Sequence, residues 1–207
     1  MKKNAIPSLS RFKAQIVEMA SLHLCAKHLP HIRKHGHYLN RSQPSKRAKV
    51  LAEPRLRLTL PLYIIDLSQS GTVANAKEYH QGWLYFVDWR RKLAGLATVR
   101  KTGNKTSLVS LLIGPTASIQ HRVAMTFLAR KITYKDLHCI EAPALHFRAL
   151  SYSRKSDGRQ FVVPLSSDMV RLRLGIGYRS RTAYMRLQSA LEHRLECARK
   201  LAKSPSR

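Results

Sequence analysis

Arginines alternate with leucines in two short stretches of the chain, the "RLRL" at 55–58 and the "RLRL" at 171–174. A β-strand sends successive side chains to opposite faces, so each stretch is expected to bury its leucines and display its arginines. If both strands lie in one sheet and in register, Arg55, Arg57, Arg171 and Arg173 share a face. A guanidinium can donate two parallel hydrogen bonds to phosphate oxygens, so this pattern predicts a binding surface for a phosphate backbone. The alternative is two separate amphipathic strands whose outer residues are only solvated.

Two predicted hairpin tips carry further cations. The turn "KTGN" separates two strand-like stretches at 93–100 and 106–113, and "SRKSDG" separates another two at 144–152 and 159–165. Basic hairpins enter or straddle a nucleic-acid groove, although the tips of most hairpins are polar in any case. The cations that these tips would present are Arg100, Lys101, Lys105, Arg154, Lys155 and Arg159.

The stretch "MVRLRLGIGYRSRTAYMRLQSAL" at 169–191 allows a different interpretation. Two helices about a glycine turn would make a helix-turn-helix with its second helix in the major groove. Arg179, Arg181, Tyr184 and Arg186 would then contact the bases. The strict alternation before Gly175 favours a strand over the first of these helices.

Histidines and a cysteine gather in "SLHLCAKHLPHIRKHGHYLN", residues 21–40. Zinc needs about four converging ligands, and this segment offers Cys25, His28, His31, His35 and His37. It has a single cysteine and no partner cluster elsewhere, and a proline and a glycine interrupt it. We therefore predict no metal site and no cofactor. The imidazoles are expected to add charge to a basic arm as the pH falls.

Residues for catalysis are harder to find. Metal-dependent nucleases gather carboxylates, but the chain has 11 acidic residues and no tight pair among them. A metal-independent RNA endonuclease could instead use a histidine as general base. His23, His80, His121, His138 and His146 are all conceivable for that role, so none is indicated and the catalytic residue stays unknown. The sequence favours a protein that is not an enzyme.

An aromatic stretch, "GWLYFVDW" at 82–89, lies beside the basic residues 90–92. On an exposed sheet its rings would stack on single-stranded bases. Rings of this size more often fill a core. We therefore expect Trp83, Tyr85, Phe86 and Trp89 to be buried.

The charge of the whole chain decides which partners are plausible. Lys and Arg total 38 against 11 Asp and Glu, a formal charge of +27. Such a surface attracts polyanions, and DNA or RNA is the partner that the charge favours. We expect no membrane association, because no long apolar run is present. Three widely spaced cysteines fit a reducing compartment, so the expected location is cytoplasmic.

Helices and strands are expected along most of the chain. Residues 8–29 predict a helix capped by Ser8, with Leu9, Phe12, Ile16 and Met19 near one face. Residues 31–49 predict a mobile basic arm. Alternating patterns predict strands at 54–67 and 170–178.

Two further helices follow the strand-rich stretches. Residues 114–132 predict an amphipathic helix with Ile119, Val123, Phe127 and Ile132 on one face. The last helix should begin at a Ser180 cap. Its predicted apolar stripe is Tyr184, Leu187, Leu191, Leu195, Ala198 and Ala202.

Together these patterns predict an α+β fold: a mostly antiparallel sheet with two main helices packed on one face, plus a basic N-terminal helix and arm. Residues 1–50 would form the helix and arm, and residues 51–207 the nucleic-acid-binding domain. The last helix, within "RTAYMRLQSALEHRLECARKLAK", resembles the C-terminal helix of integrase regulators from integrating conjugative elements, over about a tenth of the chain. No residue role is taken from that resemblance. Besides a nucleic-acid binder, a structural subunit of a nucleoprotein complex, such as that of a mobile element, therefore stays open.

Overall fold

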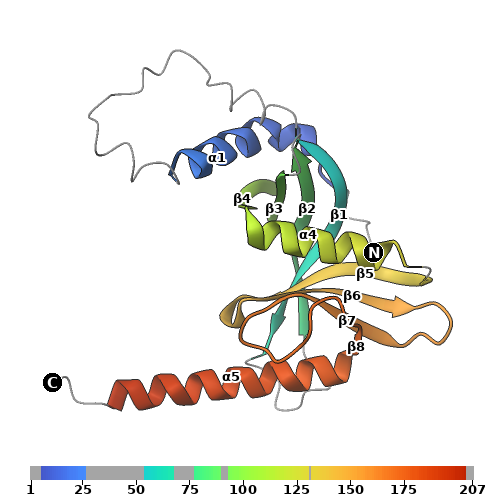
Figure 1. Ribbon diagram of the computed structural model, residues 1–207, viewed down its shortest axis with the longest axis vertical. Coiled ribbons are helices and arrows are strands. Elements are labelled where there is room, and N and C mark those ends of the chain that lie inside the picture. Colours follow the sequence, from blue (N-terminus) through green and yellow to red (C-terminus); the bar gives the residue numbers. More distant parts are fainter. Residues whose placement is uncertain (1–5, 27–53, 68–76, 90–92, 131, 204–207) are drawn as a thin grey trace. The chain divides into compact units, whose positions relative to one another are not determined.

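The computed structural model describes residues 6–26, 54–67, 77–89, 93–130 and 132–203 (Figure 1). In these residues, three α-helices and eight strands make up an α+β fold, as the sequence predicts. The helices are α1 (Lys13–Ala26), α4 (Pro115–Leu128) and α5 (Ser180–Lys203), with 3-10 turns η1 (Leu9–Phe12) and η3 (Pro143–Leu145). The strands are β1 (Arg55–Asp66), β2 (Lys77–Trp89), β3 (Leu93–Thr102), β4 (Lys105–Ile113), β5 (Tyr134–Ala142), β6 (Phe147–Arg154), β7 (Gln160–Ser167) and β8 (Tyr178–Arg179).

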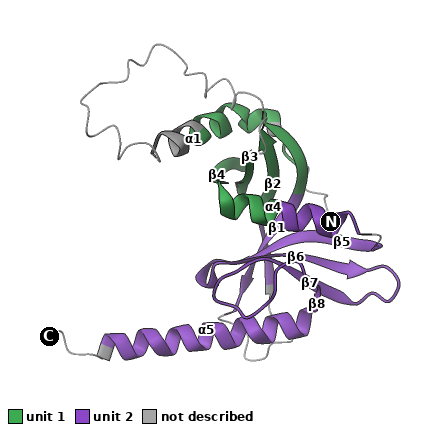
Figure 2. Ribbon diagram, in the orientation of Figure 1, with its two compact units in different colours: residues 1–59, 82–121 green, residues 60–81, 122–207 purple. Residues whose placement is uncertain are grey.

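The strands hydrogen-bond in the order β4-β3-β2-β1-β5-β6-β7-β8. The sheet is mostly antiparallel, and β1 pairs with β5 in parallel. Two compact units divide the chain, unit 1 (1–59 and 82–121) and unit 2 (60–81 and 122–207), coloured in Figure 2. Strands β1 and β2 and helix α4 each contribute residues to both units. The predicted arm lies outside the described residues, so the predicted boundary at residue 50 stays a prediction.

Helix α1 belongs to the core of unit 1. Ser8 caps the η1 turn that leads into it, since its Oγ accepts a hydrogen bond from the Ser10 amide at 3.3 Å. Phe12, Ile16 and Ala20 then fall on one face and are buried. They pack against alternate residues of β2, including Trp83 and Trp89. The prediction that the aromatic stretch forms core is confirmed, because Trp83, Tyr85, Phe86 and Trp89 are all buried.

The two predicted hairpins are also confirmed. β3 and β4 pair about a turn in which Gly103 has φ +59°, and β6 and β7 pair about a turn in which Gly158 has φ +67°. Glycine takes this left-handed conformation without a Cβ penalty. In the second turn the Asp157 carboxylate accepts a hydrogen bond from the Arg159 amide at 3.1 Å, which closes the tip.

Helices α4 and α5 cover different faces of the sheet in unit 2, whereas we expected one shared face. Ala183 and Leu187 of α5 are buried with Phe147 and Ala149 of β6. Phe127 of α4 contacts Tyr152 instead, with ring centroids 5.1 Å apart. Tyr152 and Ala149 are an odd number of residues apart on β6, so they point to opposite faces. β6 is consequently apolar on both sides, a pattern that the sequence "FRALSY" already contains.

The strand predicted at 170–178 is wrong except for its last residue, Tyr178. Residues 170–177 instead form a compact loop, in which the Val170 amide donates to the Ser167 carbonyl and the Ser167 hydroxyl to the Leu172 carbonyl. Gly175 turns the chain with φ +73°. Several main-chain groups are paired without a strand ladder, some within the loop and one with β7, where the Gly175 amide donates to the Pro164 carbonyl. The alternation survives only in burial, since Val170 and Leu172 are buried in the core of unit 2.

Two helical details also differ from the sequence prediction. The buried face of α4 consists of Ala117, Gln120, Ala124 and Phe127, and Ile119 is exposed. The predicted face had the correct period but was rotated, because small residues allow the helix to approach the sheet closely. Ser180 is the first residue of α5, and its hydroxyl has no hydrogen-bond partner among the described atoms.

Candidate nucleic-acid interface

The predicted shared face of Arg55, Arg57, Arg171 and Arg173 requires two strands, and the structure has only one of them. Arg55 and Arg57 lie on β1 in unit 1, while Arg171 and Arg173 lie in the 170–177 loop of unit 2. The face predicted from the two "RLRL" repeats is therefore wrong. Residues in an irregular loop do not alternate between two faces as strand residues do. The second "RLRL" therefore has no strand register to share with the first.

In unit 1, Arg57 already has an internal partner. Its Nε lies 2.5 Å from the Asp88 Oδ2, and the arginine side chain is 55% exposed. The β3–β4 tip of the same unit presents Arg100, Lys101 and Lys105, all exposed. No acidic residue occurs between 93 and 113, so this hairpin is purely cationic.

Unit 2 brings arginines and aromatic rings together across four neighbouring strands. Tyr134 of β5 pairs with Arg154 of β6, and Tyr152 of β6 with Phe161 of β7. Phe161 in turn pairs with Arg179 of β8. Antiparallel partners point to the same face, so these side chains lie side by side on one face, with Tyr152 buried against Phe127 of α4. We call this surface the arginine–aromatic row, consisting of Tyr134, Tyr152, Arg154, Arg159, Phe161 and Arg179.

The contacts within the row are close. The Tyr152 and Phe161 rings stack with centroids 5.5 Å apart at 18°, and the Arg154 guanidinium lies 4.5 Å from the Phe161 centroid. The rings hold the guanidinium by cation–π attraction and leave its N–H donors at the surface. Burial raises the pKa of Tyr152, and the charges of Arg154 and Arg130 oppose that rise.

One carboxylate holds two arginines at the tip beside the row. Asp157 lies 3.8 Å from the Arg154 Nε and 3.5 Å from the Arg159 Nε. Exposed pairs of this kind contribute little free energy, so the effect of Asp157 is mainly positional. Two positive charges against one negative charge leave the tip cationic, and the adjacent Lys155 is exposed.

A second group of arginines adjoins the row where the chain enters α5. Arg186 donates to the Arg171 carbonyl at 2.6 Å, and its guanidinium lies 5.7 Å from the Tyr178 ring centroid. The Tyr178 hydroxyl accepts from the Arg173 amide at 3.0 Å. These contacts link the loop to the first turns of the helix. We call the group the loop–helix arginines: Arg171, Arg173, Arg179, Arg181 and Arg186.

Electrostatics favour an anion at this second group. All five side chains are exposed, and no carboxylate among the described residues forms an ion pair with any of them. The N-terminus of α5, which begins at Ser180, adds the positive end of a helix dipole. The first helix of the alternative helix-turn-helix is absent, since residues 170–177 form a loop.

The sequence missed the aromatic members of the row. Folding "SYSRKSDGRQF" about its Asp157-Gly158 turn places Tyr152 opposite Phe161. This pairing could therefore have been predicted from the register of the hairpin. The pairing of Phe161 with Arg179 could not be found in this way, because β8 has two residues and follows an irregular loop.

Among the candidate histidines, His138 has the most defined surroundings. Its Nε2 lies 2.8 Å from the Glu78 carboxylate and its Nδ1 lies 2.7 Å from the Asp136 carbonyl. Tyr184 donates to the other Glu78 oxygen at 2.5 Å. Both ring nitrogens are occupied, so His138 is poorly placed to take a proton from a substrate.

The pKa values of this network follow from its bonds. Burial alone would lower the pKa of His138, but the hydrogen bond and charge of Glu78 outweigh burial and raise it. Burial would likewise raise the pKa of Glu78, but the bonds from His138 and Tyr184 outweigh it and lower the pKa. The pair is therefore held in its charged form.

The other histidines show no comparable arrangement. Burial lowers the pKa of His121, whose Nε2 has no hydrogen-bond partner among the described atoms. His80 packs edge-on against Tyr63, and His146 is exposed. The side chain of His23 lies outside the described residues, as do His28, His31, His35 and His37 and the side chain of Cys25.

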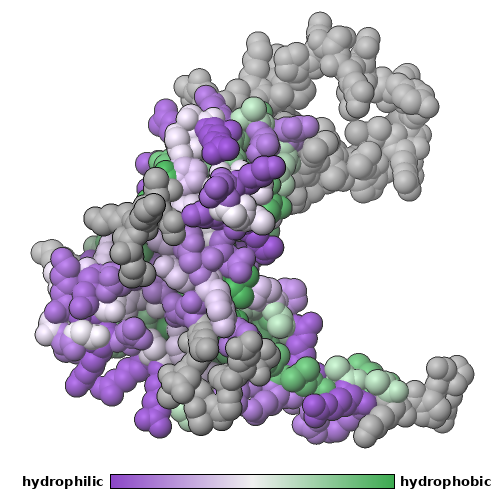
Figure 3. Space-filling view, turned by 180° about the vertical axis from the view of Figure 1, so that it is seen from behind, coloured by the Kyte–Doolittle hydropathy of each residue, from purple (hydrophilic) through white to green (hydrophobic). Residues whose placement is uncertain are grey.

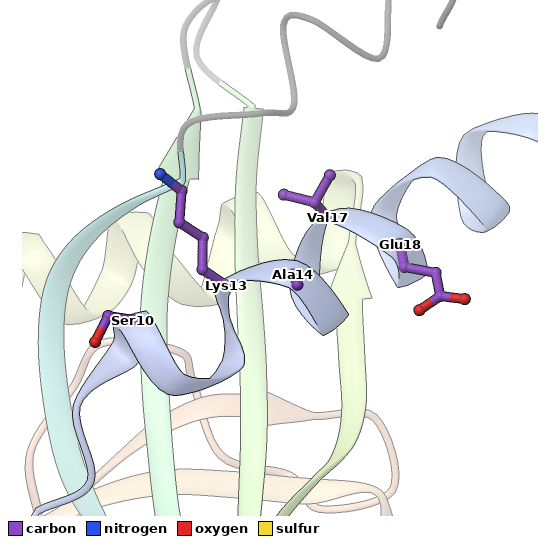
Figure 4. Close-up of a pocket in the computed structure, with 5 residues that line it drawn as sticks. All are labelled: Ser10, Lys13, Ala14, Val17 and Glu18. Carbon is purple, nitrogen blue, oxygen red and sulfur yellow. The ribbon is translucent and has the colours of Figure 1, made fainter.

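Other kinds of site are not evident in the described part of the chain. No group of three or more metal-ligating side chains occurs there, and no helix there is long and apolar enough to cross a membrane. A shallow hollow along η1 and α1 is lined by Ser10, Lys13, Ala14, Val17 and Glu18 (Figure 4). Lys13 and Glu18 point away from each other, so no polar groups converge in it. No family model, curated protein or solved structure matches this chain.

Proposed function

We propose that the protein binds nucleic acid through the arginine–aromatic row and the adjoining loop–helix arginines. The observation that supports this most directly is that Arg154 lies over the Phe161 ring and Arg179 pairs opposite it, while Arg159 shares the Asp157 carboxylate with Arg154. Three guanidiniums on one sheet face suit successive phosphates of a strand. The loop–helix arginines form a second cationic group around Tyr178, which points to the other face of β8, and Arg179 belongs to both groups. The net charge of +27 adds long-range attraction.

The proposed chemistry is phosphate binding with release of counterions. Each neutralised phosphate on a duplex makes the logarithm of the binding constant fall by about 0.9 per tenfold rise in salt. Engagement of about five phosphates therefore predicts a slope near −4.5. The proposal covers DNA and RNA, and includes a role as subunit of a nucleoprotein complex. We also propose a cytoplasmic location, which the widely spaced cysteines favour.

Fluorescence anisotropy with labelled DNA and RNA oligonucleotides, single-stranded and duplex, tests the proposal across about 50–300 mM salt. The double variant Arg179→Gln, Arg181→Gln removes two charges from the proposed surface. It should make the salt slope shallower by about 2 and weaken binding in proportion.

The matched control removes two charges elsewhere. Lys13 on α1 and Lys200 near the end of α5 are exposed. The double variant Lys13→Gln, Lys200→Gln lowers the net charge equally and should keep the wild-type slope. A wild-type slope near zero, or the same loss of binding in both double variants, would show that the surface is misassigned.

The same RNA samples, incubated in EDTA, test the metal-independent endonuclease as an alternative. Intact RNA after prolonged incubation supports a binding protein. Cleavage that disappears on replacing one histidine would replace the proposal with an enzymatic one.

A further inference from the structure

Helix α5 continues well past the surface that supports it. The helix has 24 residues, Ser180–Lys203, and is therefore about 36 Å long. Its first half is packed in unit 2, where Ala183 and Leu187 are buried. Arg194 donates a hydrogen bond to the Ala144 carbonyl, in the η3 turn. From residue 192 to residue 202 every side chain is exposed.

The apolar stripe of α5 does not stop where the support ends. Leu191, Leu195, Ala198 and Ala202 follow one another at spacings of four, three and four residues, which keeps them on one face. Leu191 is half-buried against the unit 2 core, and the other three are exposed. Leu195 is 48% exposed, and the neighbouring Leu201 is 76% exposed. Figure 3 shows apolar surface over this end of the helix. A solvated helix end has no need of such a stripe, so the pattern indicates a partner.

The spacing defines the positions that flank the stripe. Alternating steps of four and three are those of a coiled-coil seam, with Leu191 and Ala198 as one type of core position and Leu195 and Ala202 as the other. Glu192 and Arg199 then flank the seam on one side. Arg194 and Leu201 flank it on the other.

We propose that this end of α5, residues 191–202, pairs with the same segment of a second copy of the chain in antiparallel orientation. Reversal of one helix brings like flanking positions together, so Glu192 faces Arg199 of the second copy. Two-fold symmetry makes the same ion pair twice. A parallel pair would instead place Arg194 against Arg199 of the second copy, which is repulsive. The charges on the helix therefore select both the partner and its direction.

The expected association is reversible and concentration-dependent. Three helical turns bury less than the roughly 800 Å² per partner of a standard stable interface. The net charge of +27 on each copy also opposes association. At about 0.15 M salt the Debye length is about 8 Å, so repulsion between the two bodies is screened more than the ion pairs in contact.

Analytical ultracentrifugation of nucleic-acid-free protein up to about 200 µM tests the proposal. The wild type should show a mass that rises toward that of a dimer. Leu195→Glu should remove this rise. Glu192→Arg alone and Arg199→Glu alone each turn two attractive pairs into two repulsive ones, and should weaken association about tenfold. The double exchange Glu192→Arg, Arg199→Glu should restore it.

A matched control lies on the outer side of the same helix. Glu196 and Lys200 form an ion pair at 2.7 Å, away from the seam. Exchanging their charges should leave association unchanged. Circular dichroism verifies that each variant keeps its helix content. A wild type that stays monomeric, a double exchange that fails to restore association, or an Arg199→Glu variant that associates more tightly would each overturn the proposal.

Discussion

Replacing Glu78 with glutamine should weaken unit 2, and the loss should depend on pH. Glu78 accepts hydrogen bonds from both His138 and Tyr184, and so links β2 to β5 and to α5. Glutamine keeps the size of the side chain but offers one acceptor oxygen instead of two and carries no charge. One of the two donors must then face an N–H group.

The magnitude follows from burial and charge. A hydrogen bond to a charged group contributes about 1.5–3 kcal/mol. The His138 and Glu78 side chains are 19% and 24% exposed, so the loss should stay below the ~3–5 kcal/mol seen for fully buried pairs. We expect a destabilisation of about 2 kcal/mol near pH 5.5.

The sign of the pH dependence is set by both partners. The pKa of His138 is raised above its ordinary 6.5, so its contribution is complete below that value and is lost as pH rises through the folded pKa. The pKa of Glu78 is lowered below 4.5, so its contribution is lost only as pH falls through that lower value. The difference between wild type and Glu78→Gln should therefore be greatest between about pH 4.5 and 6.5 and shrink as the pH rises through the raised pKa of His138.

Urea unfolding followed by circular dichroism at several pH values measures this difference, with amide hydrogen exchange locating it in β5 and α5. Tryptophan fluorescence is unsuitable, because both tryptophans, Trp83 and Trp89, lie in unit 1. Glu141→Gln is the control. It breaks an ion pair with Arg148 at 2.9 Å, and the guanidinium stays charged throughout this range. A Glu78→Gln loss that is absent at pH 5.5, or as independent of pH as that of Glu141→Gln, would refute the reasoning.

Three further predictions concern other parts of the chain. Gly82→Ala should lower the urea midpoint of unit 1, followed by tryptophan fluorescence, by more than Gly103→Ala, because a Cβ at Gly82 overlaps a main-chain carbonyl of β3 and one at Gly103 meets open space; equal losses would contradict this. Phe161→Ala should weaken oligonucleotide binding by about 0.5–1 kcal/mol, because the ring positions the Arg154 guanidinium by a cation–π contact; unchanged binding in anisotropy titrations would argue against that positioning role. Cys197 is exposed and Cys139 is buried with its pKa raised to about 12, so Cys197→Ser should reduce the rapid reaction with a thiol reagent in native protein and Cys139→Ser should not; a fall with Cys139→Ser would show that this thiol is accessible.

Local patterns were sufficient for much of the fold. The Asp157-Gly158 turn, the helix after Gly114 and the buried aromatic stretch each depend on nearby residues, and the structure confirms all three. The strand predicted at 170–178 failed for a physical reason. Alternation reports which side chains are buried, but a strand also requires a partner strand for its main chain, and here single hydrogen bonds to the Pro164 carbonyl and the Tyr178 hydroxyl replace that pairing.

The candidate site was only partly predictable. Its arginines were visible as cations, but their grouping was not, because Arg154, Phe161 and Arg179 meet only through the pairing of three strands. The predicted face of Arg55, Arg57, Arg171 and Arg173 failed for a related reason, because it assumed a strand pairing that the structure does not contain. Similar sequence in two places does not bring those places together.

By itself the sequence determined the excess of positive charge, the kind of partner that such charge favours, and most helices and hairpins, since these follow from composition and from contacts between near neighbours. Only the tertiary structure decided which cations share a surface, which face of a sheet a helix covers, and where the apolar stripe of α5 is left uncovered. Those outcomes depend on strand register and on packing between residues far apart in the chain, and no local pattern encodes either.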